Sequence, residues 1–115
     1  MSYRIAIASN DGVLVDQHFG QAENFLVYEV SDGNAEFVED REVPHFEDEI
    51  GHSEANLERI ANLLSDCKVV FVQRIGKRAE RHLLLNGIKS FAVDFSVNHI
   101  LTTLLKRQNG RVKLF

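Results

Sequence analysis

The sequence lacks several features, and each absence narrows the possible functions. Its 115 residues include one cysteine, Cys67, which excludes both a disulfide within the chain and a cluster held by several thiolates of one chain. No apolar run is long enough to span a bilayer, and the start MSYRIAIASN lacks the regions of a secretory signal. We expect a cytoplasmic protein without membrane contact. Any metal or cluster must then bind through histidines, carboxylates, a partner's ligands or ligands of its own.

The patterns of several enzyme classes are also missing. The sequence contains neither the phosphate loop GxxxxGK[ST] nor the dinucleotide fingerprint GxGxxG, which argues against a nucleotide-dependent enzyme. Nuclease chemistry needs carboxylates that converge on metal ions, yet the strand expected at 68–73 is followed by Arg74. No Ser/His/Asp or Cys/His set comes together either. We therefore expect a protein that is not an enzyme.

Charged side chains are unevenly distributed around the net charge of −4. Residues 1–73 hold 4 basic and 15 acidic side chains, whereas residues 74–115 hold 9 basic and 2 acidic ones. Either the two halves form solvated surfaces that attract each other, or the basic half faces an anionic ligand or partner. The basic residues have few aromatic neighbours, so we expect no specific nucleic-acid binding. The expected state is a monomer or a weak homo-oligomer.

Hydrophobic periodicity predicts secondary structure in the order β-β-β-α-β-α-β-α. The expected strands are 3–9, 24–30, 35–43, 68–73 and 89–94, and the expected helices are 54–65, 76–87 and 97–108. Gly33 marks a hairpin turn, Ser53 and Ser96 cap the first and third helices, and a left-handed Gly87 ends the second. We assign residues 1–108 to one α/β domain and 109–115 to a C-terminal tail.

The connections between these elements predict how the sheet is ordered. The hairpin makes the second strand antiparallel to its neighbours, and right-handed helical crossovers make the fourth and fifth strands parallel to the first. The simplest order is 3-2-1-4-5. The loops after the first and fourth strands then meet at one edge of the sheet, near the starts of the helices. Cys67, which precedes the fourth strand, is expected at the opposite edge, about 15–20 Å from His18.

We predict a binding site where the loop after the first strand meets the turn QRIGKR after the fourth. Ligands of open parallel sheets bind outside the carboxyl ends of the strands, and the N–H groups at a helix start favour an anion. Glycines let the loop fold over a ligand, and Phe19 packs the loop onto the core. The candidate binding residues are Asn10, His18, Phe19, Gly20, Arg74, Gly76 and Lys77, and the candidate metal ligands are His18, His45 and His52.

Two segments, RIAIASNDGVLVDQHFGQAENFLVYEV and CKVVFVQRIGKRAERHLLLNGIKSFAV, carry a family resemblance. The chain resembles the dinitrogenase iron-molybdenum cofactor biosynthesis family over residues 3–107, most sharply in the HFG, IG and NGI elements. The resemblance implies a ribonuclease H-like α/β fold with three layers. It also implies a carrier in nitrogen fixation for an iron-sulfur cluster, an iron-molybdenum cofactor or a precursor, exchanged with donor and acceptor proteins. By the position of HFG, His18 looks like the family's cluster contact.

A second class of function remains open on the residues alone. A metal-free domain that senses a small anion, or that mediates a protein interaction, would use the same glycine-flanked pocket. For each candidate histidine the alternative is a structural hydrogen bond or a solvated loop position. Aerobic purification removes a labile cluster and makes the two classes look alike, whereas anaerobic reconstitution with iron and sulfide separates them.

Overall fold

A computed structural model describes residues 2–31, 33–44 and 54–107 of the chain. The strands are β1 (Tyr3–Ile7), β2 (Asn24–Ser31), β3 (Asn34–Glu42), β4 (Cys67–Val72) and β5 (Lys89–Ala92). The α-helices are α1 (Glu54–Leu63), α2 (Lys77–Leu85) and α3 (Val97–Arg107), and a short 3₁₀-helix, η1, spans Phe19–Gln21. The predicted order of strands and α-helices is confirmed, and η1 is an addition to it.

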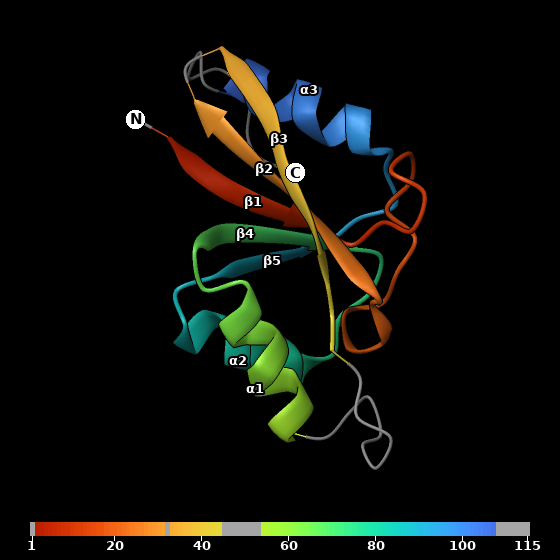
Figure 1. Ribbon diagram of the computed structural model, residues 1–115, viewed down its shortest axis with the longest axis vertical. Coiled ribbons are helices and arrows are strands. Elements are labelled where there is room, and N and C mark those ends of the chain that lie inside the picture. Colours follow the sequence, from red (N-terminus) through yellow and green to blue (C-terminus); the bar gives the residue numbers. More distant parts are fainter. Residues whose placement is uncertain (1, 32, 45–53, 108–115) are drawn as a thin grey trace.

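The strands form one mixed sheet in the order β3-β2-β1-β4-β5 (Figure 1). β2 is antiparallel to both β1 and β3, whereas β4 is parallel to both β1 and β5. The predicted order and all strand directions are therefore confirmed. Because β1 and β4 are parallel neighbours, the segments that follow them leave the sheet on the same side, as Figure 1 shows.

Side chains that alternate along the strands pack into two separate hydrophobic cores, one on each face of the sheet. Ile5 and Ile7 contribute to the core under α3, whereas Ala6 and Ala8 contribute to the core under α1 and α2. This alternation follows from the period of two along a strand. β4 is buried on both faces, with Val70 in one core and Phe71 in the other, as its continuous apolar run predicts. The result is a three-layer α/β fold, as expected.

Side-chain hydrogen bonds end β1 two residues before the predicted boundary at residue 9. The buried hydroxyl of Ser9 accepts a hydrogen bond from the Gly12 N–H at 2.9 Å. The carboxylate of Asp11 accepts from the N–H groups of Val13 and Leu14 at 2.8 and 3.1 Å, and these bonds lower the pKa of that carboxyl. Such bonds draw the backbone into a turn. The turn begins the connection that leads to His18.

Three of the predicted local signals agree with the structure, while others lie outside the residues it describes. Gly33 and Gly87 have φ of 71° and 77°, which suits the hairpin turn and the end of α2. The hydroxyl of Ser96 accepts a hydrogen bond from the His99 N–H at 3.0 Å, so it caps α3. The proposed Ser53 cap, His45, His52 and the tail 109–115 lie outside the described residues.

None of the helices among the described residues is long and apolar enough to cross a membrane.

Candidate functional site

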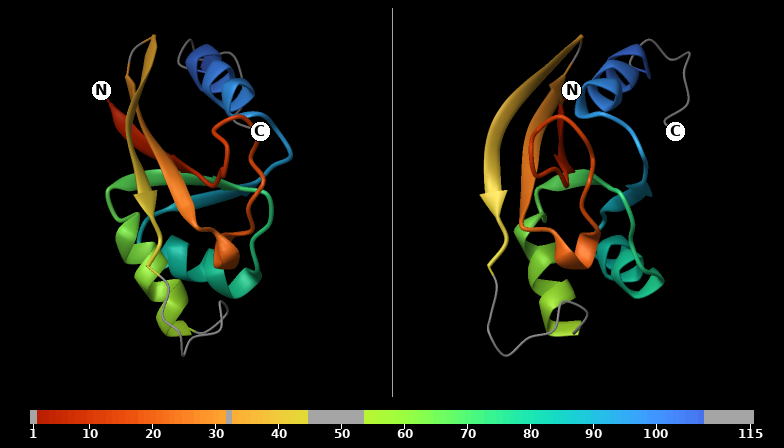
Figure 2. Two further views of the ribbon diagram at one scale, coloured as in Figure 1. Left: turned by 45° about the vertical axis from the view of Figure 1, so that its right-hand side comes forward. Right: turned by 90° about the vertical axis from the view of Figure 1, so that its right-hand side faces the viewer.

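The backbone around His18 continues the sheet beyond the end of β4. The Gln73 N–H donates to the Gln17 carbonyl, and the Phe19 N–H donates to the Arg74 carbonyl, both at 2.9 Å. His18 and Arg74 therefore form a parallel bridge. Figure 2 shows the connection between β1 and β2 passing along the same edge of the sheet as the connection from β4 to α2. The two predicted halves of the site thus lie side by side.

Phe19 anchors this segment in the core while His18 stays at the surface. The Phe19 side chain is fully buried, and its ring lies 5.9 Å from that of Phe25 between centroids. His18 is exposed and extended, with φ −78° and ψ 144°. Gly20 lies inside the 3₁₀-helix that follows, so its freedom to adopt positive φ is not used. The alternation of buried and exposed residues presents the imidazole to solvent on a fixed backbone.

Gly76 precedes α2 and leaves room beside its first turn. Its φ is −78° and its carbonyl accepts the Glu80 N–H at 3.0 Å, a conformation that residues with side chains also adopt. A Cβ at this position would have no heavy atom within 4 Å. Neither the backbone nor the packing of the described residues therefore requires glycine here. A side chain at position 76 would enter open space.

A hollow of about 500 Å³ joins these features. Its lining residues come from the His18 segment, the first turn of α1, the turn after β4 and the start of α2: His18, Phe19, Gly20, Leu57, Arg74, Ile75, Gly76, Lys77, Arg78 and Ala79. Arg74 and Lys77 are exposed, and no carboxylate of the described residues forms an ion pair with either. The lining therefore combines exposed cationic side chains with apolar ones.

Six of the seven predicted binding residues line this hollow, and Asn10 does not. Asn10 lines two other hollows, each together with Glu23, and its N–H donates to the Asp16 carboxylate at 3.0 Å. The other four lining residues, Leu57, Ile75, Arg78 and Ala79, are not among the seven predicted. Leu57 is an apolar residue of the core under α1 and α2, and such a residue gives no separate signal in the sequence for the hollow.

The described residues include no group of three or more histidine, cysteine, aspartate or glutamate side chains that could hold a metal ion. His18 is the one imidazole among the lining residues of the hollow. A metal ion bound there would need ligands beyond those lining residues.

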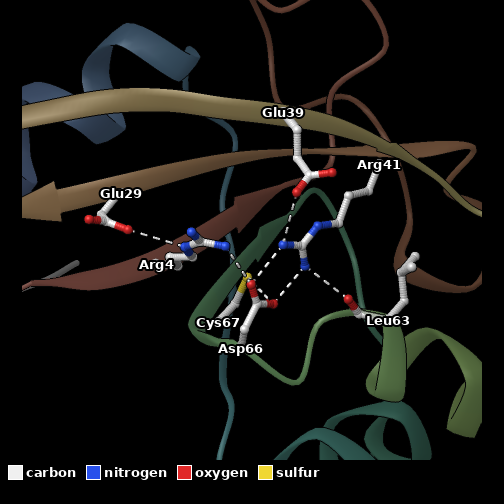
Figure 3. A network of polar contacts seen from close by, with 7 residues as sticks. All are labelled: Arg4, Glu29, Glu39, Arg41, Leu63, Asp66 and Cys67. Atoms are coloured by element: carbon white, nitrogen blue, oxygen red, sulfur yellow. Dashed lines mark hydrogen bonds and ion pairs between the residues drawn. The ribbon is translucent and has the colours of Figure 1, made fainter.

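Cys67 lies at the opposite end of β4 from Arg74, as expected, in a network of charged residues (Figure 3). Its side chain is buried, and burial together with the neighbouring charge of Asp66 raises the pKa of its thiol to about 12. Asp66 accepts hydrogen bonds from Arg41 at 2.6 and 2.7 Å and from Arg4 at 2.9 Å. The thiol therefore lies beside the ion pairs of Asp66, at the end of the sheet opposite the hollow.

The fold and the hollow together define a small three-layer α/β domain with a cationic recess at the carboxyl ends of its parallel strands. The chain belongs to the dinitrogenase iron-molybdenum cofactor family, whose model matches residues 1–107. The family and the fold class expected from the sequence are both confirmed.

Two curated relatives are similar to this chain over most of its length. The chain is 31% identical over 107 residues to the FeMo cofactor biosynthesis protein NifB of Chlorobaculum tepidum, an alignment that covers 91% of this chain and 24% of that protein. It is 32% identical over 91 residues to the protein NifX of Azotobacter vinelandii, and this alignment covers 79% of this chain and 56% of that protein. The chain thus spans about a quarter of this NifB and just over half of this NifX.

The fold is also seen in a solved structure. The apo form of the orange protein from Desulfovibrio gigas matches with a TM-score of 0.67 and 23% identity, over 97% of this chain and 92% of that one. At this identity the match concerns the fold alone.

Proposed function

We propose that this protein binds and carries an iron-sulfur cluster, an iron-molybdenum cofactor or a precursor of it, and that it catalyses no reaction. The cargo occupies the hollow between the His18 segment and the start of α2. The observation that carries the proposal is the meeting of one exposed imidazole, three cationic side chains and a glycine without a packing role around one recess. Membership of the family and the NifX relative support it.

The metal-binding groups that line the hollow suit a cluster that is assembled before it reaches this protein. An imidazole is a suitable ligand for iron, but one imidazole leaves most metal sites of a cluster without protein ligands. The other metal sites would then carry terminal ligands that the cluster brings or that a partner protein supplies, because Cys67, the one cysteine of the chain, is buried at the other end of β4. Arg74 and Lys77 would offset the negative charge of such a cluster. In this proposal His18 contacts the cluster and the two cations hold it.

The exposed position of the site suits exchange with other proteins. His18, Arg74 and Lys77 are all exposed, so a cargo can enter and leave without unfolding of the core. We propose that the partners are the proteins that donate and accept the cluster, and that nucleic acid is not among them. Sub-micromolar binding of RNA or DNA at physiological salt, measured by filter binding, would contradict the second statement.

Anaerobic reconstitution with iron and sulfide tests the site, with absorbance as the readout of cluster retention. His18→Ala should reduce retention and leave the circular dichroism spectrum unchanged, because an exposed side chain contributes little to the core. Cys67→Ala should retain the cluster and lose some stability. The matched control is His99→Ala, since His99 is also exposed but lies at the start of α3, outside the hollow.

The two substitutions give opposite answers if the proposal is wrong. A protein that loses the cluster with Cys67→Ala and keeps it with His18→Ala would place the site at the other end of the sheet. Equal retention in wild type and His18→Ala would remove His18 from the site.

A further inference from the structure

We propose that the outer face of α2 binds the exposed acidic face of β3 in a second copy of this chain, so that copies associate head to tail. The inference goes beyond the proposed cargo and does not depend on it. Each of the two surfaces carries charge of one sign beside exposed apolar side chains, and the two patterns are complementary.

The outer face of α2 is basic at its start and apolar at its end. Lys77 and Arg81 are exposed and lie one turn apart, on the same side of the helix. Leu84 and Leu85 follow on the next turn and are 57% and 79% exposed. No ion pair among the described residues involves Lys77 or Arg81. A recess of about 490 Å³ runs along this face, and its lining residues are Lys77, Arg78, Arg81, His82 and Leu85.

The acidic face of β3 is produced by a shift in strand register. The register shifts between Val27 and Tyr28, so residues 24, 26 and 28 of β2 pair with Glu42, Asp40 and Phe37. Since alternate residues of β2 point to the same side of the sheet, their three partners share one face of β3. Asp40 and Glu42 are exposed, and Phe37 is 55% exposed. An edge strand thus presents two carboxylates and an aromatic ring in one row.

The acidic end of this row borders a hollow of about 400 Å³. Glu23, Asp40 and Glu42 contribute to its lining, and none of the three carboxylates forms an ion pair with another described residue. Asp40 accepts a hydrogen bond from the Asn24 amide at 3.0 Å, which orients its carboxylate. Surfaces of opposite charge attract each other and fix the register of an interface. This acidic hollow is therefore a suitable site for the basic start of α2.

The spacing of charged and apolar groups is similar on the two surfaces. Lys77 precedes Leu85 by two turns, about 12 Å along the helix axis. Phe37 and Asp40 are three positions apart on β3, about 10 Å along the strand. A helix lying along the strand can therefore place its leucines on Phe37 while its cations reach the carboxylates. Burial of the leucines and the ring adds an apolar contribution to the electrostatic one.

The two surfaces cannot meet within one copy of the chain. The right-hand view of Figure 2 shows β3 and α2 on opposite sides of the molecule, with α1 between them. Because the surfaces differ, pairing between copies is heterologous, and it either continues into longer chains or closes into a ring. Lys77 and Arg78 also line the proposed cargo hollow, so the docked copy lies beside that hollow.

Sedimentation equilibrium of the whole chain tests the association. At low salt the weight-average mass should rise above that of one chain as the protein concentration increases, with a dissociation constant between about 10 μM and 1 mM, because exposed ion pairs contribute little. High salt should return the mass toward that of one chain. A mass of one chain up to about 1 mM protein at low salt would overturn the inference. Association that salt does not weaken would also contradict it.

Two charge reversals test which surfaces pair. Arg81→Glu and Asp40→Lys should each raise the dissociation constant at least about tenfold, because each places like charges opposite one another. Arg81 lies outside the cargo hollow, so this variant leaves the lining of that hollow intact. The matched control is Glu36→Lys, since Glu36 is exposed but pairs with Glu29 on the other face of β3. It should associate like wild type.

A mixture of the two variants gives the decisive result. The intact α2 of Asp40→Lys can dock on the intact β3 of Arg81→Glu, so the mixture should associate at concentrations at which either variant alone stays a monomer. A mixture that stays monomeric where wild type associates would refute the pairing, as would unchanged association in either folded variant. Circular dichroism checks folding, and Glu42→Lys tests the same face of β3 if Asp40→Lys does not fold.

Discussion

Arg41 and Asp66 form a two-pronged ion pair at the end of the sheet opposite His18, with N–O distances of 2.6 and 2.7 Å (Figure 3). The same guanidinium donates to the Leu63 carbonyl at 3.0 Å, so it joins the edge strand β3 to the end of α1. Arg4 of β1 donates to Asp66 Oδ2 at 2.9 Å, the oxygen that also accepts from Arg41 Nη2. Stability and the proposed binding thus depend on residues at different ends of the same sheet.

This pair predicts a loss of stability in acid. The hydrogen bonds from Arg41, with those from Arg4, hold the pKa of the Asp66 carboxyl well below its usual range. A lowered pKa in the folded state stabilises the protein above the unfolded value of about 4, and the stabilisation is lost as the pH falls below it. Asp66→Asn should reduce stability at neutral pH by about 1–2 kcal/mol, because the carboxylate is partly exposed.

Urea unfolding across the acid range measures this effect. The difference in unfolding free energy between wild type and Asp66→Asn should shrink as the pH falls below about 4. A difference that stays constant with pH would mean that the ion pair contributes no net stability through ionisation.

The Cys67 thiol should be unreactive in the folded protein. Its side chain is 3% exposed, and burial raises its pKa to about 12, so the reactive thiolate is scarce near neutral pH. A disulfide reagent such as dithiobis-nitrobenzoate should label the protein rapidly in denaturing urea and very slowly without it. Rapid labelling of the folded protein would show that the α1–β4 turn opens readily.

Alanine substitutions at two glycines should separate an effect on cluster retention from an effect on stability. Gly76→Ala should cost less than about 1 kcal/mol, because φ at this position suits alanine and the cost is that of a poorer helix cap. It should nevertheless weaken cluster retention, since Gly76 lines the hollow and an added methyl group would take up open space there. Gly87→Ala should cost about 1 kcal/mol or more, because its φ is 77°, and should spare retention. Thermal unfolding and anaerobic reconstitution measure the two effects, and the reverse pattern would refute the proposed site.

Removing positive charges from the lining of the hollow should weaken the retention of an anionic cargo. Arg74→Gln with Lys77→Gln removes two positive charges from the lining, and the remaining affinity should depend less on salt. Lys89→Gln is the matched control, because Lys89 is exposed at the start of β5, outside the hollow. Cluster retention is measured at a low and a high salt concentration. At low salt it should be lower in the double variant than in wild type. Similar retention in the double variant and in the control would argue that charge does not hold the cargo.

The fold was predictable because the decisive signals are local. Ile5 and Ile7 alternate with small residues, the run KVVFV is buried on both faces, and Gly33 and Gly87 punctuate the chain with the expected positive φ. Strand directions then follow from connection lengths. The end of β1 was less accurate, because the side chains of Ser9 and Asp11 bind the backbone of their own loop, an interaction that a hydrophobic pattern does not contain.

The site was predictable in part for a similar reason. Topology alone brings His18 and Arg74 to one edge of the sheet. Leu57 reaches the hollow only through long-range packing of α1, and neither Leu57 nor Ile75 was assigned to the site. Sequence reasoning also placed Asn10 there, but its N–H is held by Asp16 and its side chain lines other hollows. The network of Arg4, Arg41 and Asp66 joins residues more than 20 positions apart, beyond the reach of local patterns.

The two hydrogen bonds that hold the His18 segment against the end of β4 join the Phe19 N–H to the Arg74 carbonyl and the Gln73 N–H to the Gln17 carbonyl. Neither involves the side chain of His18 or Arg74. Replacing either side chain therefore changes the chemistry of the recess without moving its frame. A domain built in this way can acquire a different ligand through single substitutions, each compatible with the existing core. Relatives with this fold can then diverge in what they bind while remaining superimposable.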